Sequence, residues 1–173
     1  MSYLAMINTT TTIRLATLDD LDIMMDIVDE AKQTMRNSGN FRQWVNGYPQ
    51  RELLADDIAR QQCYLMLDND RAVALFVLVA GPDPTYATIE GGDWLDNDRP
   101  YHVVHRIASR SDSRNVMRRL LQFAFSVDHN IRIDTHADNV IMQHIMEREG
   151  FSYCGIIYVA DGTPRKAYQK IIG

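Results

Sequence analysis

The chain of 173 residues is long enough to bury a sizeable core and short enough to form one domain, which we place at residues 1–173. Apolar residues make up 46% of it and charged residues 24%, an ordinary balance for a globular protein. The net charge of −5 argues against a general nucleic-acid binder, and it is compatible with a small cationic substrate such as an amine. No apolar run approaches the roughly 20 residues that cross a bilayer, so we expect no membrane partner.

The N-terminal sequence MSYLAMINTTTT has neither a basic start nor a continuous apolar stretch, which argues against a secretory signal and predicts a frayed start. Cys63 and Cys154 stand in apolar, strand-like segments, and their spacing is not that of a metal site. Buried thiols in a reducing cytosol explain them better than a single disulfide. We therefore expect a cytoplasmic protein.

Periodicity and turn residues predict the secondary structure. Thr17 and Asp20 form a capping-box pattern at the start of the first helix, and Asn37-Ser38-Gly39 ends it. The chain order predicted is strand 12–15, helices 17–36 and 51–61, a hairpin of strands 63–67 and 72–79, a short strand 86–89, strand 101–109, helix 116–127, strand 131–136, helix 138–149, and a hairpin of strands 153–159 and 166–171. This order indicates a mixed α/β (α+β) domain with one parallel step in its middle.

The stretch from Tyr101 to Phe151 contains that parallel step. Its first strand leads through the loop RSDSRN directly into an amphipathic helix. The first N–H groups of a helix have no partner within the helix, and the helix dipole is positive at that end. This arrangement indicates an anion site.

Four segments resemble the GNAT (N-acetyltransferase) superfamily. They are IRLATLDDLDIMMDIVDEA, QWVNGYP, YHVVHRIAS and RIDTHADNVIMQHIMEREGFSYCGIIYV, which together span nearly the whole chain. The last is the most specific, because Asn139 followed by a helix ending in Gly150-Phe151 recurs in the superfamily. The resemblance implies a mixed, mostly antiparallel sheet flanked by helices. In such a sheet the strand at 103–109 splays from the parallel strand at 131–135, and acetyl-CoA lies in the wedge between them.

The resemblance also implies how acetyl-CoA is held. Backbone groups of the splayed strand bond the pantetheine arm, N–H groups near Ile107 and Ala108 hold the thioester carbonyl, and the arginine-rich loop and following helix hold the diphosphate. The cofactor-binding residues that it implies are Ile107, Ala108, Ser109, Arg114, Asn115, Val116, Met117, Arg118, Asn139 and Met142.

The loop departs from the superfamily pattern Gln/Arg-x-x-Gly-x-Gly/Ala. Asp112, Asn115 and Met117 stand at its three defining positions. Asparagine adopts left-handed backbone more readily than most residues, so Asn115 is tolerable. The Met117 thioether, by contrast, stands where glycine lets a phosphate approach the backbone, and we expect it to be an obstruction.

Arg110, Arg114, Arg118 and Arg119 cluster where the helix begins. Positive side chains there oppose the helix dipole unless an anion is bound. We interpret them as ligands of an anion, and the alternative is a solvated basic face.

Direct acetyl transfer needs a base for the amine proton and protonation of the CoA thiolate. Many superfamily members use a tyrosine on the last helix as the acid, but Met146 occupies that position here. The candidate bases are Glu90, His105 and His136. Core packing is the alternative role for His105, and a turn or cap is the alternative for His136. Tyr158 is a replacement acid, with packing as its alternative role.

Aromatic residues in loops either fold back onto the core or bind a ligand. Trp44, Tyr48, Glu90 and Trp94 are predicted to line the acceptor side.

No metal is predicted. His102 and His105 point to opposite faces of a strand, and Asp138 is better explained as the cap of the helix after it.

These observations predict an acetyl-CoA-dependent N-acetyltransferase that moves an acetyl group directly to a primary amine of a small molecule or peptide. The alternative is a catalytically inactive module of the same fold that binds a ligand or dimerises. By analogy with the family, the protein is expected to form a homodimer.

Overall fold

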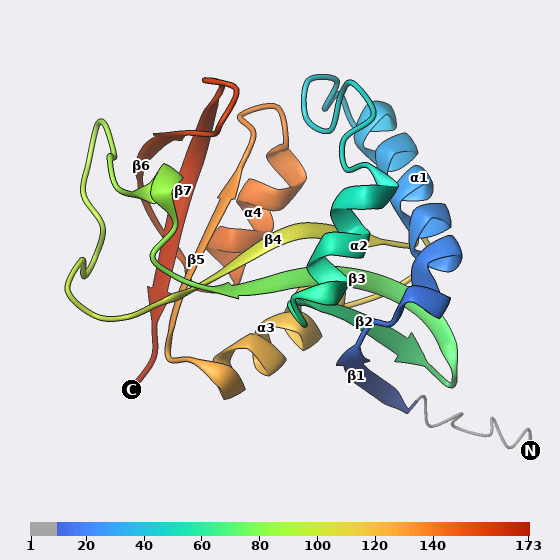
Figure 1. Cartoon of the computed structure of the whole chain (residues 1–173). Helices are drawn as coiled ribbons and strands as arrows, with labels where there is room; N and C mark the ends of the chain where they lie inside the picture. Colours follow the sequence, from blue (N-terminus) through green and yellow to red (C-terminus); the bar gives the residue numbers. More distant parts are fainter. Residues whose placement is uncertain (1–9) are drawn as a thin grey trace, which may run out of the picture.

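The structure is a computed structural model that describes residues 10–173 (Figure 1). Its elements are β1 (Thr11–Leu15), α1 (Leu21–Asn37), α2 (Arg51–Ala59), β2 (Cys63–Asp68), β3 (Arg71–Ala80), β4 (His102–Ser109), α3 (Val116–Val127), β5 (Asn130–Thr135), α4 (Val140–Arg148), β6 (Ser152–Tyr158) and β7 (Pro164–Ile171). Two 3₁₀ turns, Leu18–Asp20 and Pro84–Tyr86, complete the list. Most of the start predicted to fray lies outside the described residues.

The strands form one sheet in the order β1-β2-β3-β4-β5-β7-β6. Every neighbouring pair is antiparallel except β4 and β5. Those two strands pair only at His102 with Ile131 and at Val103 with Arg132, and they then diverge. The prediction of a mostly antiparallel sheet with one splayed parallel pair is confirmed.

Helices cover both faces of the sheet (Figure 1). The apolar stripe of α1, including Met24 and Val28, packs with Leu54 of α2 on one face. The stripe of α3, including Leu120, packs with Met146 of α4 on the other. The gap between β4 and β5 therefore lies between two helical layers, with a packed core on each side of it.

Beyond Val103 and Arg132 the two strands enclose a wedge, and within it β4 carries a bulge. Arg106 has a φ of 50°, and the pairing register of β3 with β4 shifts between Leu75 and Val77. A bulge leaves one residue out of the ladder and re-aims the residues around it. The alternation along β4 is therefore broken beyond His105, while His102 to His105 keep a continuous register with β3.

Several local predictions are confirmed. Asp20 Oδ2 accepts the Thr17 N–H at 2.8 Å as the capping box requires, although a 3₁₀ turn precedes α1. Gly39 has the left-handed φ of 87° that suits a helix C-cap. Cys63 and Cys154 are both buried, free thiols.

Two local predictions are wrong. The segment 86–89 is not a strand: Pro84–Tyr86 forms a 3₁₀ turn, and Glu90 makes an isolated bridge with Ile156. The cap of α4 is Asn139, whose Oδ1 accepts the Met142 N–H at 3.1 Å, and not Asp138. Asp138 instead forms a two-bonded ion pair with Arg42, at 2.7 Å for each bond.

Within residues 10–173, no helix has the length and apolar content to cross a membrane.

Candidate active site

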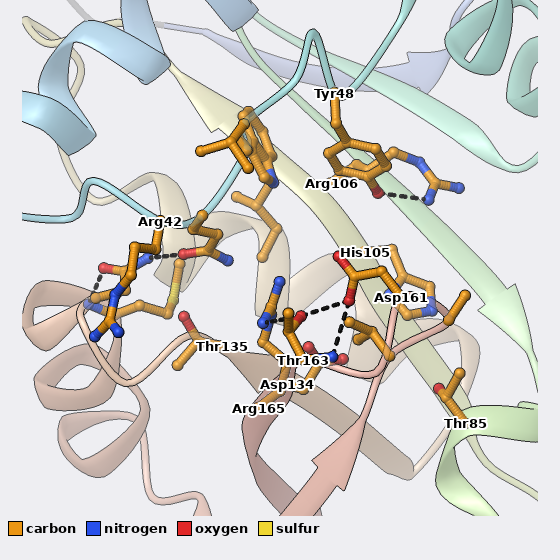
Figure 2. Close-up of a pocket in the computed structure, with 18 of the residues that line it drawn as sticks. Arg42, Tyr48, Thr85, His105, Arg106, Asp134, Thr135, Asp161, Thr163 and Arg165 are labelled. Carbon is orange, nitrogen blue, oxygen red and sulfur yellow. Dashed lines mark hydrogen bonds between the residues drawn. The ribbon is translucent and has the colours of Figure 1, made fainter.

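A cavity of about 550 Å³ includes the wedge between β4 and β5 (Figure 2). Its floor is formed by β4 and β5, one wall by the α1–α2 loop, and the opposite wall by the turn between β6 and β7. Beyond Val103 and Arg132, the backbone N–H and C=O groups of β4 and β5 that face the wedge have no partner on the opposite strand. An extended ligand can form hydrogen bonds with them. The cavity can therefore hold a strand-like arm and a second, smaller molecule beside it.

His105 and Asp83 form a hydrogen-bonded pair on the cavity wall. His105 Nε2 lies 3.0 Å from Asp83 Oδ2, and the other carboxylate oxygen accepts bonds from the hydroxyl and N–H of Thr85 at 2.6 and 2.9 Å. The hydrogen bond from His105 lowers the pKa of Asp83 to about 2, so the group is a carboxylate at neutral pH. Donation from Nε2 to this carboxylate leaves Nδ1 of a neutral ring as a proton acceptor.

A second carboxylate, Asp134 of β5, lines the same cavity. Its Oδ2 accepts the Tyr86 hydroxyl at 2.6 Å. Burial raises the pKa of Tyr86 well above its usual value, so this hydroxyl keeps its proton and remains a donor. Asp83 and Asp134 thus place two carboxylates in a lining that also contains Arg165, and the carboxylates suit an ammonium group.

Arg106, the residue at the bulge, ties β4 to α2 and to the α1–α2 loop. Its Nε and Nη2 donate to the two oxygens of the buried Asp57 at 2.7 Å each, and its Nη1 donates to the Tyr48 hydroxyl at 3.2 Å (Figure 2). Asp57 neutralises the charge of Arg106, so this guanidinium is already paired within the protein. It fixes the position of the bulge and of the Tyr48 ring above it.

The α1–α2 loop is held over the wedge from both sides. Arg36 donates to the backbone oxygens of Asn40, Gln43 and Trp44 at 2.8 to 3.0 Å. Gln43 Oε1 accepts from Asn139 Nδ2 at 3.1 Å, next to the ion pair of Arg42 with Asp138. These contacts place the loop as a preformed wall of the cavity.

The loop between β4 and α3 enters the helix through Asn115, whose backbone is left-handed with a φ of 54°. The Asn115 side chain makes no capping bond, so the first N–H groups of α3 are available to an anion. Met117 is only 6% exposed and packs in the core beside α3. The expectation that its thioether obstructs the loop is therefore wrong.

An internal anion occupies part of this loop. Glu30 of α1 accepts the Ser111 N–H at 2.9 Å, the Ser111 hydroxyl at 2.8 Å and an Arg110 N–H at 3.2 Å. These bonds, chiefly those of Ser111, lower the pKa of Glu30. Asp112 pairs with Arg71 at 3.2 Å.

The four arginines of the helix start differ in what they contact. Arg110 bonds Glu30 and the Ala72 carbonyl, and Arg119 bonds Asp68 and the Arg114 carbonyl. Arg118 lies 3.6 Å from Glu149 and is largely exposed, and within residues 10–173 the Arg114 side chain makes no hydrogen bond or ion pair. Arg114 and Arg118 line a second cavity of about 590 Å³ beside α3, together with Arg119, so these two are the arginines of the four whose side chains are not already bonded to an aspartate or to Glu30.

The three predicted catalytic residues lie in different places. His105 lines the cavity. His136, in contrast, is outside the lining and 7% exposed, and its Nδ1 accepts the Asp138 N–H at 2.9 Å, which is the turn role. Burial lowers the pKa of His136. Tyr158 also lies away from the cavity, where its hydroxyl donates to Glu90 at 2.9 Å. The structure does not support either of the last two as catalytic.

The predicted substrate residues divide in the same way. Trp44 and Tyr48 line the cavity, although Trp44 is only 8% exposed and packs on α1 and α2. Glu90 is not in the lining. Trp94 is buried in a separate cluster, where its Nε1 donates to the Tyr86 carbonyl at 3.0 Å, so its substrate role is wrong.

The predicted cofactor residues fall into three groups. Ile107, Asn139 and Met142 line the cavity, and Arg114, Asn115 and Arg118 line the second cavity. Ala108 and Ser109 pair with Leu75 and Ala74 of β3 and are in neither lining. Val116 and Met117 are buried in the core, so only their backbone faces the loop.

Sequence reasoning missed Asp83, Asp134 and Thr135 as cavity residues. Asp83 precedes Pro84 in a turn, and its link to His105 spans 22 positions, so only the folded chain brings them together. Among residues 10–173, no group of three or more histidine, cysteine or acidic side chains is arranged to hold a metal ion.

Comparison with known proteins identifies the family. Neither a scan of protein-family models nor a search of curated proteins gave a match. A GNAT-family acetyltransferase from Streptococcus agalactiae is 32% identical, with a TM-score of 0.86 over 94% of this chain and 96% of that one. A putative acetyltransferase from Staphylococcus aureus is 25% identical, with a TM-score of 0.68 over 92% and 98%. The ribosomal-protein-S18-alanine N-acetyltransferase of Escherichia coli, 13% identical with a TM-score of 0.60 over 95% of each chain, shares the fold.

The chain therefore belongs to the GNAT family of acetyltransferases. The fold and these neighbours support acetyl transfer as its general activity.

Proposed function

We propose that the protein transfers an acetyl group from acetyl-CoA directly to a primary amine of a small molecule or peptide. The observation that carries the proposal is the His105–Asp83 pair, which lies on the wall of the same cavity as the open wedge. A base and a place for an extended thioester donor thus share one space, as direct transfer requires.

The donor side fits acetyl-CoA. The unpaired groups of β4 beyond Val103 suit the pantetheine arm, and Asn139 and Met142 line the wedge beside it. Arg114, Arg118 and the uncapped start of α3 suit the diphosphate. When bound, acetyl-CoA supplies the thioester whose acetyl group is transferred.

The acceptor side is formed by the end of the cavity that carries the carboxylates of Asp83 and Asp134. Asp83 and Asp134 attract an ammonium, and the rings of Trp44 and Tyr48 cover its apolar part. The ammonium loses one proton to water before its nitrogen can attack, His105 takes the second proton as the amide forms, and Asp83 holds the imidazole in the required tautomer. We also propose that the protein is cytoplasmic, in agreement with its two free cysteines, and that it forms a homodimer.

The test is calorimetric titration with acetyl-CoA and with CoA, followed by screening of amines for turnover. We expect micromolar binding and turnover of at least one primary amine. If no binding occurs at millimolar acetyl-CoA, the proposal is wrong.

Replacing both Arg114 and Arg118 by alanine should weaken CoA binding about tenfold or more, because charge-assisted bonds to phosphate are lost. Calorimetry at two salt concentrations measures the loss and should show a smaller salt dependence. The control removes two exposed arginines at the two ends of α2, Arg51 and the C-cap residue Arg60, and should leave affinity unchanged. Equal affinities of both double variants would refute the anion-site assignment.

A catalytically inactive module that binds a ligand or dimerises is the second candidate. Glu30 favours this candidate. It already accepts the N–H and the hydroxyl of Ser111, two donors in the loop between β4 and α3 that a bound diphosphate would need. Restoring glycine at position 117 would not distinguish the two candidates, because Met117 is buried and its removal would leave a core cavity.

The Glu30→Gln substitution distinguishes them. In an enzyme, removing this competing charge should raise CoA affinity several-fold, since the loop donors and Arg110 then face the diphosphate. Asp29→Asn, the same change at the exposed neighbouring position, is the control. If neither variant nor the parent binds CoA, the inactive module is the better description.

A further inference from the structure

Thr135, the last residue of β5, carries a buried hydroxyl with no partner. The residue is 1% exposed, and its Oγ1 makes no hydrogen bond with any group in residues 10–173. It lines the cavity, and Figure 2 shows it between Asp134 and Arg42. A buried hydroxyl without a hydrogen bond costs free energy of folding. A bound ligand that forms a hydrogen bond with this hydroxyl would remove that cost.

The parallel register places Thr135 level with the bulge of β4. Val103 pairs with Arg132, and parallel strands advance by equal steps, so Thr135 corresponds to Arg106, three positions further along each strand. The strands have diverged at this level. Thr135 therefore lies beside the wedge at about the level of Ile107, where the family is expected to hold the thioester.

Thr135 belongs to the donor side of the wedge. Side chains alternate along a strand, so Thr135 and Asp134 face opposite sides of β5. Ile133, on the side of Thr135, packs in the core with α3 and α4, and the other cavity residues of that region, Asn139 and Met142, come from the start of α4. Asp134 faces the acceptor.

On α4, the position that supplies an acid in many relatives is occupied by Met146, and His144 of the same helix is exposed and outside the cavity lining. Met146 is fully buried in the core and has no proton to donate. Tyr158, the predicted replacement, bonds Glu90 outside the cavity. A hydrogen bond to the sulfur then comes from a side chain of the wedge or from water.

We infer that the Thr135 hydroxyl donates a hydrogen bond to the CoA sulfur and stabilises it as the leaving thiolate. The inference rests on the proposed function. In the step, the bond from the amine nitrogen to the acetyl carbon forms and the bond from that carbon to sulfur breaks. The sulfur keeps the electron pair as a thiolate bonded by Thr135, and His105 takes the amine proton.

The test compares Thr135→Val, which is nearly the same shape without the hydroxyl, with Thr135→Ser, which keeps it. Thermal unfolding of the free protein comes first. We expect the valine variant to melt at the same temperature as the parent or higher, because it removes an unsatisfied group.

The second measurement is a pH titration of bound CoA, followed by the ultraviolet absorbance of the thiolate. A hydroxyl that bonds the thiolate favours the charged form and lowers the pKa of the thiol. We expect Thr135→Val to raise the pKa of the bound thiol by about one unit, a tenfold change, and Thr135→Ser to match the parent. The valine variant should also lose kcat more than it changes KM.

An unchanged pKa of the bound thiol in Thr135→Val overturns the inference. So does a lower melting temperature of the free valine variant with unchanged CoA affinity, because water then satisfies the hydroxyl. Failure of the parent protein to bind CoA is a different result and sinks the proposed function itself.

Discussion

The His105→Ala variant is expected to lose about 10²- to 10⁴-fold in kcat, the usual contribution of a general base. His105 is the one predicted base that lies in the cavity, and the Asp83 carboxylate 3.0 Å from its Nε2 leaves Nδ1 to receive the proton. Steady-state kinetics with the best amine found by screening measures the loss. Affinity for acetyl-CoA should stay within about twofold of the parent value in calorimetry, because His105 lies on the proposed acceptor side of the cavity and not on the donor side.

The same strand offers a matched control. His102 also pairs with an aspartate, Asp128, at 2.7 Å, and its side chain is 25% exposed like that of His105, but it does not line the cavity. His102→Ala removes an equivalent hydrogen bond between a histidine and an aspartate and should leave kcat nearly unchanged. Asp83→Asn should reproduce a large part of the His105 loss, since the imidazole is then no longer held in one tautomer. Equal kcat in the two histidine variants would show that the base is water or another group.

The parts of the fold that depend on local pattern were predictable from the sequence. The two hairpins and the strand–loop–helix of the central stretch follow from runs of apolar residues and turn residues. The spacing of Val116, Met117, Leu120, Leu121 and Ala124 also marks one buried face of α3. That signal could have shown that Met117 faces the core and not the phosphate loop.

The candidate site was only partly predictable, because its pairs join distant parts of the chain. Asp83 meets His105, and Tyr86 meets Asp134, through turns whose path no periodicity reports. Arg106 forms the bulge without glycine, so nothing in the strand sequence signals the break in alternation. His136 and Tyr158 carried suitable chemistry, but each bonds a neighbour outside the cavity.

Asp57→Ala is expected to have the largest effect on stability. Asp57 is 5% exposed and accepts two bonds of 2.7 Å from Arg106, so its removal leaves a guanidinium in a largely buried place without its counter-charge. Breaking a buried ion pair from one side costs about 3–5 kcal/mol in free energy of unfolding. Urea denaturation measures this difference.

Asp56→Ala is the matched control, since Asp56 is the adjacent residue of α2 and its side chain is exposed. It should change the free energy of unfolding by no more than about 0.5 kcal/mol. The double variant Asp57→Leu with Arg106→Met should recover much of the loss, because two apolar groups replace the pair and no charge stays buried. It should also acetylate poorly, since the bulge and Tyr48 lose their anchor. If Asp57→Ala is as stable as Asp56→Ala, water reaches Arg106 and the bulge is held by the strand pairing with β3 alone.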